Sequence, residues 1–196
     1  MSDTAAVPPE VPPTDMDSDD ACLQRVAALD PDAMEPIFTR WKLPLLSFFY
    51  RATGSRADAE DLTLLTLESV YRSAPKYRSE GRFAAWLFTI ARRELAHEWR
   101  RQRRHPVQPV DPEELTEYAT DQTEHDRRRA AELEEQLLKA LRHCKDRERE
   151  ALILAASGHH THASMAAILR VTESHLNLIL HRGRKTLRRF FNLQSS

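Results

Sequence analysis

A proline-containing segment divides this chain into two blocks and restricts the fold more than any other feature. Residues 105–123 contain Pro106, Pro109 and Pro112 and lack apolar periodicity, which is typical of a linker. On both sides, apolar residues recur at the three- and four-residue spacing of amphipathic helices. The 196 residues include only 4 glycines. We therefore predict an all-α protein with two small helical domains.

The predicted organisation has four parts. Residues 1–22, proline-rich and acidic, are expected to be a disordered tail. Residues 23–104 form the first helical domain, 105–129 a flexible acidic linker, and 130–193 the second helical domain. In the first domain Pro44 marks a kink or a boundary, and Ser55 or Asp58 caps the helix that follows the turn at 53–55. Residues 82–104 are expected to form one long helix, apolar at its start and basic at its end.

Charge is strongly segregated, although the net charge is only −1. Residues 92–104 read RRELAHEWRRQRR, residues 182–189 read RGRKTLRR, and acidic residues dominate 1–20 and 111–126. Two basic clusters separated by acidic segments indicate two contacts with a polyanion. Taken singly, each cluster is better explained as an ordinary solvated helix face.

The second basic cluster follows a predicted helix-turn-helix. A short interval at 170–172 separates two helical patterns, and Thr172 is a natural N-cap. The second helix of such a motif enters the major groove, where its first residues meet base edges and later basic residues hold phosphates. Leu176, Ile179 and Leu180 provide an inward face. The candidate DNA-contacting residues are Thr172, Ser174, His175, Asn177, His181, Arg182, Arg184 and Lys185.

Three stretches together resemble a known family. SRADAEDL (55–62), RFAAWLFTIARRELAHEWRRQRR (82–104) and VTESHLNLILHRGRKTLRR (171–189) occur in the order and spacing of the extracytoplasmic-function group of bacterial RNA polymerase sigma factors. The resemblance implies a cytoplasmic, nucleoid-associated protein that binds the β′ and β subunits of core polymerase and promoter DNA. It also implies that the linker lies in the polymerase cleft, although a plain soluble tether explains its composition equally well.

The resemblance assigns the two promoter elements to the two domains. The helix at 171–189 would read the minus-thirty-five element. The loop before the long basic helix would capture a base from the melted minus-ten strand. Unstacking this base costs free energy, which contacts in a pocket must offset. The implied minus-ten residues are Lys76, Tyr77, Arg78 and Ser79 in the loop, and Arg92, Arg93, Arg100 and Arg101 on the helix.

Several positions depart from the family pattern. Relatives commonly carry asparagine at the place of Arg93, an acid at His97, and basic residues at Asn177 and Ile179. Arg170 replaces a turn glycine, at a cost of about 1 kcal/mol if that position needs a positive φ. These departures predict an unusual promoter preference.

The helix at 61–71, DLTLLTLESVY, carries a further departure. In relatives this helix docks on the clamp helices of β′, and it presents glutamine and an acid where this chain has Leu64 and Leu65. The expected docking residues are Asp58, Glu60, Asp61, Leu64, Leu65 and Glu68. A surface that has lost charge should bind its partner more weakly.

Three explanations of this departure stay open. A Ser/Thr protein kinase that modifies Thr63, or else Thr66, would restore negative charge. A second explanation is that the two threonines are simply tolerated in a buried helix. A third is that the leucines bind a regulator such as an anti-sigma helix. Helical periodicity permits more than one choice of buried arc.

Other functions have little support in the sequence. No nucleophile elbow, phosphate loop or zincin motif is present, so we expect no catalytic residue, no cofactor and no enzyme activity. His159, His160 and His162 lack a firm ligand pattern, and no metal site is expected. Cys22 and Cys144 should be reduced thiols, and no membrane-spanning stretch is expected. The nearest rival is a helix-turn-helix regulator that binds DNA without core polymerase.

Overall fold

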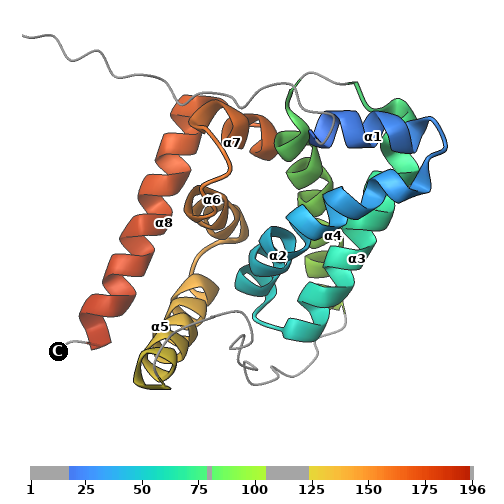
Figure 1. Cartoon of the computed structure of the whole chain (residues 1–196). Coiled ribbons are helices and arrows are strands. Elements are labelled where there is room, and N and C mark those ends of the chain that lie inside the picture. Colours follow the sequence, from blue (N-terminus) through green and yellow to red (C-terminus); the bar gives the residue numbers. More distant parts are fainter. Residues whose placement is uncertain (1–17, 79–80, 105–123, 195–196) are drawn as a thin grey trace, which may run out of the picture.

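The computed structural model describes residues 18–78, 81–104 and 124–194, and within these ranges every regular element is helical (Figure 1). The predicted all-α fold is confirmed. The elements are α1 (Asp19–Ala27), η1 (Pro31–Ala33), α2 (Met34–Thr53), α3 (Arg56–Ser73), η2 (Ala74–Lys76), α4 (Phe83–Arg104), α5 (Glu124–Arg142), α6 (Asp146–Ala156), α7 (His162–Leu169) and α8 (Glu173–Gln194).

The first half, α1 to α4, is built on the packing of α3 against both α2 and α4. Gly54 ends α2 with φ 72°, a left-handed conformation that favours glycine. Ser55 then caps α3, because its hydroxyl accepts the Asp58 N–H at 3.2 Å. The core between these helices contains Phe48, Phe49 and Phe88, which are at most 2% exposed.

The second half, α5 to α8, is closed by the contact of α6 with α8. Gly183 allows this approach, since a Cβ at that position would lie 2.8 Å from Leu152 Cδ1. Arg170 ends α7 with φ 54°, so the predicted turn with a positive φ at a non-glycine residue is present. The predicted N-cap of α8 is confirmed, because the Thr172 hydroxyl accepts the His175 N–H at 3.2 Å.

Two sequence expectations were wrong at their edges, and one of the two alternatives at Pro44 was wrong. Residues 19–22, predicted to belong to a disordered tail, lie in α1, where Ser18 accepts the Ala21 N–H and Cys22 is fully buried. The last part of the predicted linker is helical, since α5 begins at Glu124. Of the two predictions for Pro44, the boundary is wrong, because α2 continues through this residue and buries Leu45 and Leu46. In α1 and α2, tertiary burial outweighs local composition. Residues 1–17 and 105–123 lie outside the described ranges.

The two halves pack against each other. Helix α7 contacts α4, and both α5 and α6 contact α2, while α8 lies at the outer edge of the molecule (Figure 1). One continuous set of buried apolar side chains runs through both halves. None of the described helices is long and apolar enough to cross a bilayer.

Candidate functional surfaces

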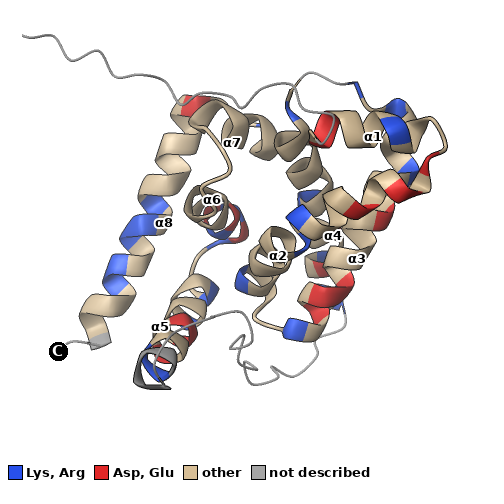
Figure 2. Cartoon of the chain, viewed as in Figure 1, with Lys and Arg blue, Asp and Glu red and all other residues tan. Residues whose placement is uncertain are grey.

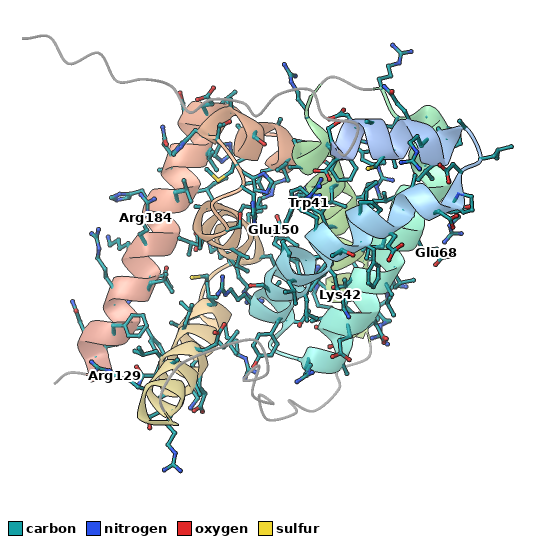
Figure 3. All side chains as sticks on the ribbon, in the orientation of Figure 1. Trp41, Lys42, Glu68, Arg129, Glu150 and Arg184 are labelled. Atoms are coloured by element: carbon teal, nitrogen blue, oxygen red, sulfur yellow. The ribbon has the colours of Figure 1, made fainter. Side chains whose placement is uncertain are left out.

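The outward face of α8 carries the residues expected to meet DNA. Residues Ser174, His175, Asn177, His181, Arg182, Arg184 and Lys185 are all exposed, and Thr172 is exposed while its hydroxyl caps the helix. Leu176, Ile179 and Leu180 are at most 5% exposed, as the inward face requires. Figure 2 shows Lys and Arg gathered from the middle of α8 towards its C-terminal end, and Arg184 points away from the molecule in Figure 3. The helix therefore presents polar residues first and basic residues later.

The loop expected to capture a base is only partly open. Lys76 and Arg78 are exposed, and Ser79 lies outside the described residues. Tyr77 is half-buried: its hydroxyl donates to the Asp20 carboxylate at 2.6 Å, and its ring lies 4.6 Å from that of Trp86. This aromatic contact gives the loop a fixed wall beside the start of α4.

The four arginines expected to contact the minus-ten DNA have different surroundings. Arg93 and Arg100 are exposed. Arg101 forms a two-point ion pair with Glu98, at 2.7 and 2.8 Å, which raises the pKa of the guanidinium. Arg92 is turned towards the second half, where its Nε donates to the Glu150 carboxylate at 3.1 Å. Of these four arginines, only Arg93 and Arg100 are exposed and lack an ion pair with any residue in the part of the chain described.

The α3 surface combines acids with two leucines. Glu60, Asp61 and Glu68 are exposed, and Leu64 and Leu65 are 58% and 46% exposed. Glu60 pairs with Arg56 at 3.0 Å and Glu68 with Arg72 at 2.9 Å, each one helical turn away. Red patches along α3 in Figure 2 mark the acids, and Glu68 points outwards in Figure 3.

A cavity of about 350 Å³ adjoins this surface between α3 and α4. Leu62 and Leu65 face Glu94, Glu98 and Arg101 across it. Nearby, burial and then the charge of Glu98 raise the pKa of Asp58, whose carboxylate accepts a hydrogen bond from Gln102 at 3.3 Å. The cavity therefore has an apolar wall on α3 and an ionic wall on α4.

The structure settles which arc of α3 is buried. Thr63 is 3% exposed and Thr66 is fully buried, on the same side as Ala59, Leu62 and Leu67. The Thr63 hydroxyl donates to the Ala59 carbonyl at 2.7 Å, whereas the Thr66 hydroxyl has no partner among the described residues. Neither hydroxyl is open to a kinase in this conformation, so the phosphorylation hypothesis gains no support here.

The histidine cluster is structural in part. His160 packs on Phe88 with ring centres 4.6 Å apart, and burial lowers its pKa to about 4. His159 lies 5.5 Å from the Trp41 ring, and His162 is exposed. No group of His, Cys, Asp or Glu with metal-binding geometry occurs within the described ranges.

Two residues that the sequence did not single out are central to the contact between the halves. Glu150, with its side chain 3% exposed, pairs with Arg92, and burial raises its pKa. Burial also lowers the pKa of Arg149, which donates to the Ala52 carbonyl of the first half at 3.2 Å. In the sequence both lie in DREREALILAA, a charged run that is normally solvated, so no local signal distinguishes them.

Residues 37–105 match the family model of sigma-70 region 2. RNA polymerase sigma factor YlaC of Bacillus subtilis is 26% identical over 159 residues, which cover 81% of this chain and 91% of that protein. ECF RNA polymerase sigma factor SigE of Mycolicibacterium smegmatis is 30% identical over 152 residues, which cover 75% of this chain and 57% of that protein.

A solved structure has the same fold. The structure of CnrH in complex with the cytosolic domain of CnrY superposes with a TM-score of 0.68 at 18% sequence identity. The superposition covers 89% of this chain and 97% of that one. At this identity the likeness establishes the arrangement of helices.

Proposed function

This chain belongs to the extracytoplasmic-function group of the sigma-70 family of bacterial RNA polymerase sigma factors, and from that premise we propose that it directs core polymerase to a restricted set of promoters. Helix α3 would dock on the β′ subunit, and the β subunit would complete the contact with core. The region around η2 and α4 would engage the minus-ten element, and α8 the minus-thirty-five element. The protein would act in the bacterial cytoplasm, at the nucleoid, in response to a stress or another signal.

The arrangement of α8 is the observation that supports this proposal most strongly. All eight residues expected at the minus-thirty-five element are exposed together at the outer edge of the molecule. Residues near its N-terminus offer hydroxyl, imidazole and amide groups for base edges. The arginines and Lys185 that follow offer salt-dependent contacts to phosphates.

The docking surface supports contact with a large partner. Leu64 and Leu65 expose apolar surface between Asp61 and Glu68, so a basic partner with an apolar ridge would match both features. Since Thr63 and Thr66 are buried, control by a Ser/Thr kinase would require α3 to leave the core first. We propose that the leucines contact β′ directly, without prior phosphorylation.

Reconstituted transcription tests this function. Unmodified protein and core polymerase would be incubated with a library of randomised promoters, and the transcribed templates would be sequenced. We expect enrichment of two conserved elements at a fixed spacing, and no transcription without the protein. A regulator that acts without core would bind DNA but would not support initiation.

Variants of α3 extend this test to the docking surface. Leu64→Asp, which adds repulsion within an acidic face, should weaken binding to a β′ clamp fragment. Glu35→Gln, on the exposed part of α2, is a control and should bind normally. Equal binding by both variants would rule out α3 as the docking surface.

A further inference from the structure

The contact between the two halves is polar at its centre. Arg92 of α4 and Glu150 of α6 form an ion pair at 3.1 Å, in which the Glu150 side chain is 3% exposed and the Arg92 side chain 23% exposed. Figure 3 shows Glu150 between α6 and the first half. The Glu150 carboxylate is therefore enclosed by protein, while the Arg92 side chain keeps part of its surface in solvent.

Further contacts surround this ion pair. The Arg149 guanidinium lies over the Trp99 ring at 5.5 Å and donates to the Ala52 carbonyl. His160 packs edge-on against Phe88. Arg103 pairs with Asp146 at 2.8 Å in a more open position, with side chains 63% and 43% exposed. Residues of α6 and α7 thus cover part of α4 and α2.

We propose that Glu150 occupies at Arg92 the place of a DNA phosphate, so that the closed arrangement of the two halves and the binding of DNA along α4 exclude each other. This inference rests on the proposed function, because it takes α4 as the minus-ten surface. A carboxylate and a phosphate bind a guanidinium through the same charged hydrogen bonds. A single Arg92 side chain that is paired with Glu150 cannot bind a DNA phosphate at the same time.

The same contact carries features that make it reversible. A buried ion pair gains little net stability, because desolvation of both charges offsets their attraction. Burial raises the pKa of Glu150 in spite of Arg92, which shows that desolvation dominates at this carboxyl. In addition, Trp41 Nε1 and His160 Nε2 are buried without a hydrogen-bond partner among the described residues, and such atoms regain partners when water enters.

The charge pattern favours DNA as the competitor. Arg93, Arg100, Arg103 and Arg104 are exposed along the same helix as Arg92. A polyanion that reaches these side chains is held beside Arg92 at high local concentration. Separation of the two halves would then add Arg92 to the contact that DNA has already made with these arginines.

Distance measurements between spin labels test closure directly. Labels would be placed at Thr39→Cys in α2 and Ala163→Cys in α7, since both positions are exposed and the native Cys22 and Cys144 are buried. We expect one short distance in the free full-length protein and a longer one when a non-specific DNA duplex is added. A distance that does not change when DNA binds would overturn the proposal.

A matched pair of variants tests the role of Glu150. Glu150→Gln and Asp146→Asn both remove one acid from α6 at the contact, but only the first removes the enclosed ion pair. We expect Glu150→Gln to lengthen the distance without DNA and to bind the duplex roughly tenfold more tightly, as loss of a competing charged hydrogen bond predicts. Asp146→Asn should change both quantities little. Equal affinities of the two variants would contradict the competition.

A double-mutant cycle shows whether the gain acts through Arg92. Adding Arg92→Ala to Glu150→Gln should abolish most of the tighter binding. A gain in DNA affinity that persists in the double variant would overturn the proposal.

A second variant is available if Glu150→Gln loses helical circular dichroism. His160→Glu opens the contact between the two halves from α7. Because that variant adds negative charge, tighter DNA binding by it has to come from opening, and binding no tighter than wild type would count against the proposal.

These measurements separate the inference from the proposed function. Failure of reconstituted transcription alongside an Arg92-dependent competition would remove the sigma activity and leave the internal competition intact. Normal transcription together with label distances that DNA does not change would support the sigma activity and overturn the internal competition.

Discussion

Arg149 of α6 donates a hydrogen bond from Nη1 to the Ala52 carbonyl oxygen at 3.2 Å, at the last turn of α2. The same guanidinium donates to the carbonyl oxygens of Leu141 at 2.9 Å and Cys144 at 3.3 Å. A single side chain therefore satisfies carbonyls at the α5–α6 corner and joins this corner to the first half.

Replacing Arg149 should destabilise the second half. Arg149→Met keeps much of the apolar stem but leaves these buried carbonyls unpaired, so we expect the free energy of unfolding to fall by roughly 2–4 kcal/mol. Arg147→Met, at an exposed neighbouring position, should change it by less than about 0.5 kcal/mol. Urea unfolding followed by circular dichroism measures both. Equal midpoints would show that water replaces the guanidinium without cost.

A charge at Thr63 should unfold α3 rather than activate it. Thr63→Glu buries a carboxylate beside Leu62 and Leu67, and we expect a loss of roughly 3–5 kcal/mol in unfolding free energy. Leu64→Glu, one residue along and 58% exposed, should be nearly neutral. A melting temperature of Thr63→Glu equal to that of the wild type would mean that Thr63 reaches solvent, and the kinase hypothesis would then regain its basis.

The neighbouring threonine should behave in the opposite way. The Thr66 hydroxyl is buried without a partner among the described residues, so Thr66→Val removes an unsatisfied group and keeps the shape. We expect unchanged or higher thermal stability, by about 1 kcal/mol. Thr63→Val, which breaks the bond to the Ala59 carbonyl, is the comparison and should be less stable than Thr66→Val. The reverse order would indicate that a water molecule satisfies Thr66.

Residues at the two ends of the α8 surface should affect DNA binding differently. Arg182→Ala should weaken binding to every sequence and reduce its salt dependence by about one counterion. His175→Ala and Asn177→Ala should instead change which minus-thirty-five sequences are preferred. Binding of the holoenzyme to selected promoters over a range of salt concentrations measures both effects. Identical changes from all three variants would mean that α8 does not lie in the groove as proposed.

Protonation of His160 on acidification should favour separation of the two halves. Burial against Phe88 lowers the pKa of His160 to about 4 from its ordinary 6.5, so above both values the group is neutral in either state. Between these two pKa values, only the imidazole of the open arrangement takes up a proton. The closed arrangement should therefore lose about 1.4 kcal/mol of stability per pH unit. Glu150, whose pKa is raised by burial, has the opposite effect.

The contribution of His160 can be isolated from that of Glu150. The spacing between labels on α2 and α7 would be followed from pH 7 to pH 5. His160→Gln should remove the histidine component of the pH dependence, and His159→Gln, at an exposed neighbour, should retain it. Identical pH profiles of His160→Gln and the wild type would assign the response to another group.

Local patterns were sufficient for the helices and for the outward face of α8. Leu176, Ile179 and Leu180 repeat at helical spacing and are buried, so the residues between them had to be exposed. Residue type and position predicted the cap at Thr172 and limited the cap of α3 to Ser55 or Asp58, of which the structure has Ser55. Where two arcs were nearly equally apolar, as in α3, periodicity did not decide, and the packing of α2 and α4 placed Thr63 and Thr66 inside.

The amino-acid sequence by itself determined an all-helical chain in two blocks, with basic helix ends and an acidic α3, because amphipathic spacing, capping residues and charge runs act over a few neighbouring positions. Only the tertiary structure decided that Arg92 meets Glu150 and that His160 rests on Phe88. These partners are 58 residues apart in the first pair and belong to different blocks in both. A contact of that kind depends on how the surfaces of the two blocks fit together, and a local sequence pattern does not predict that fit.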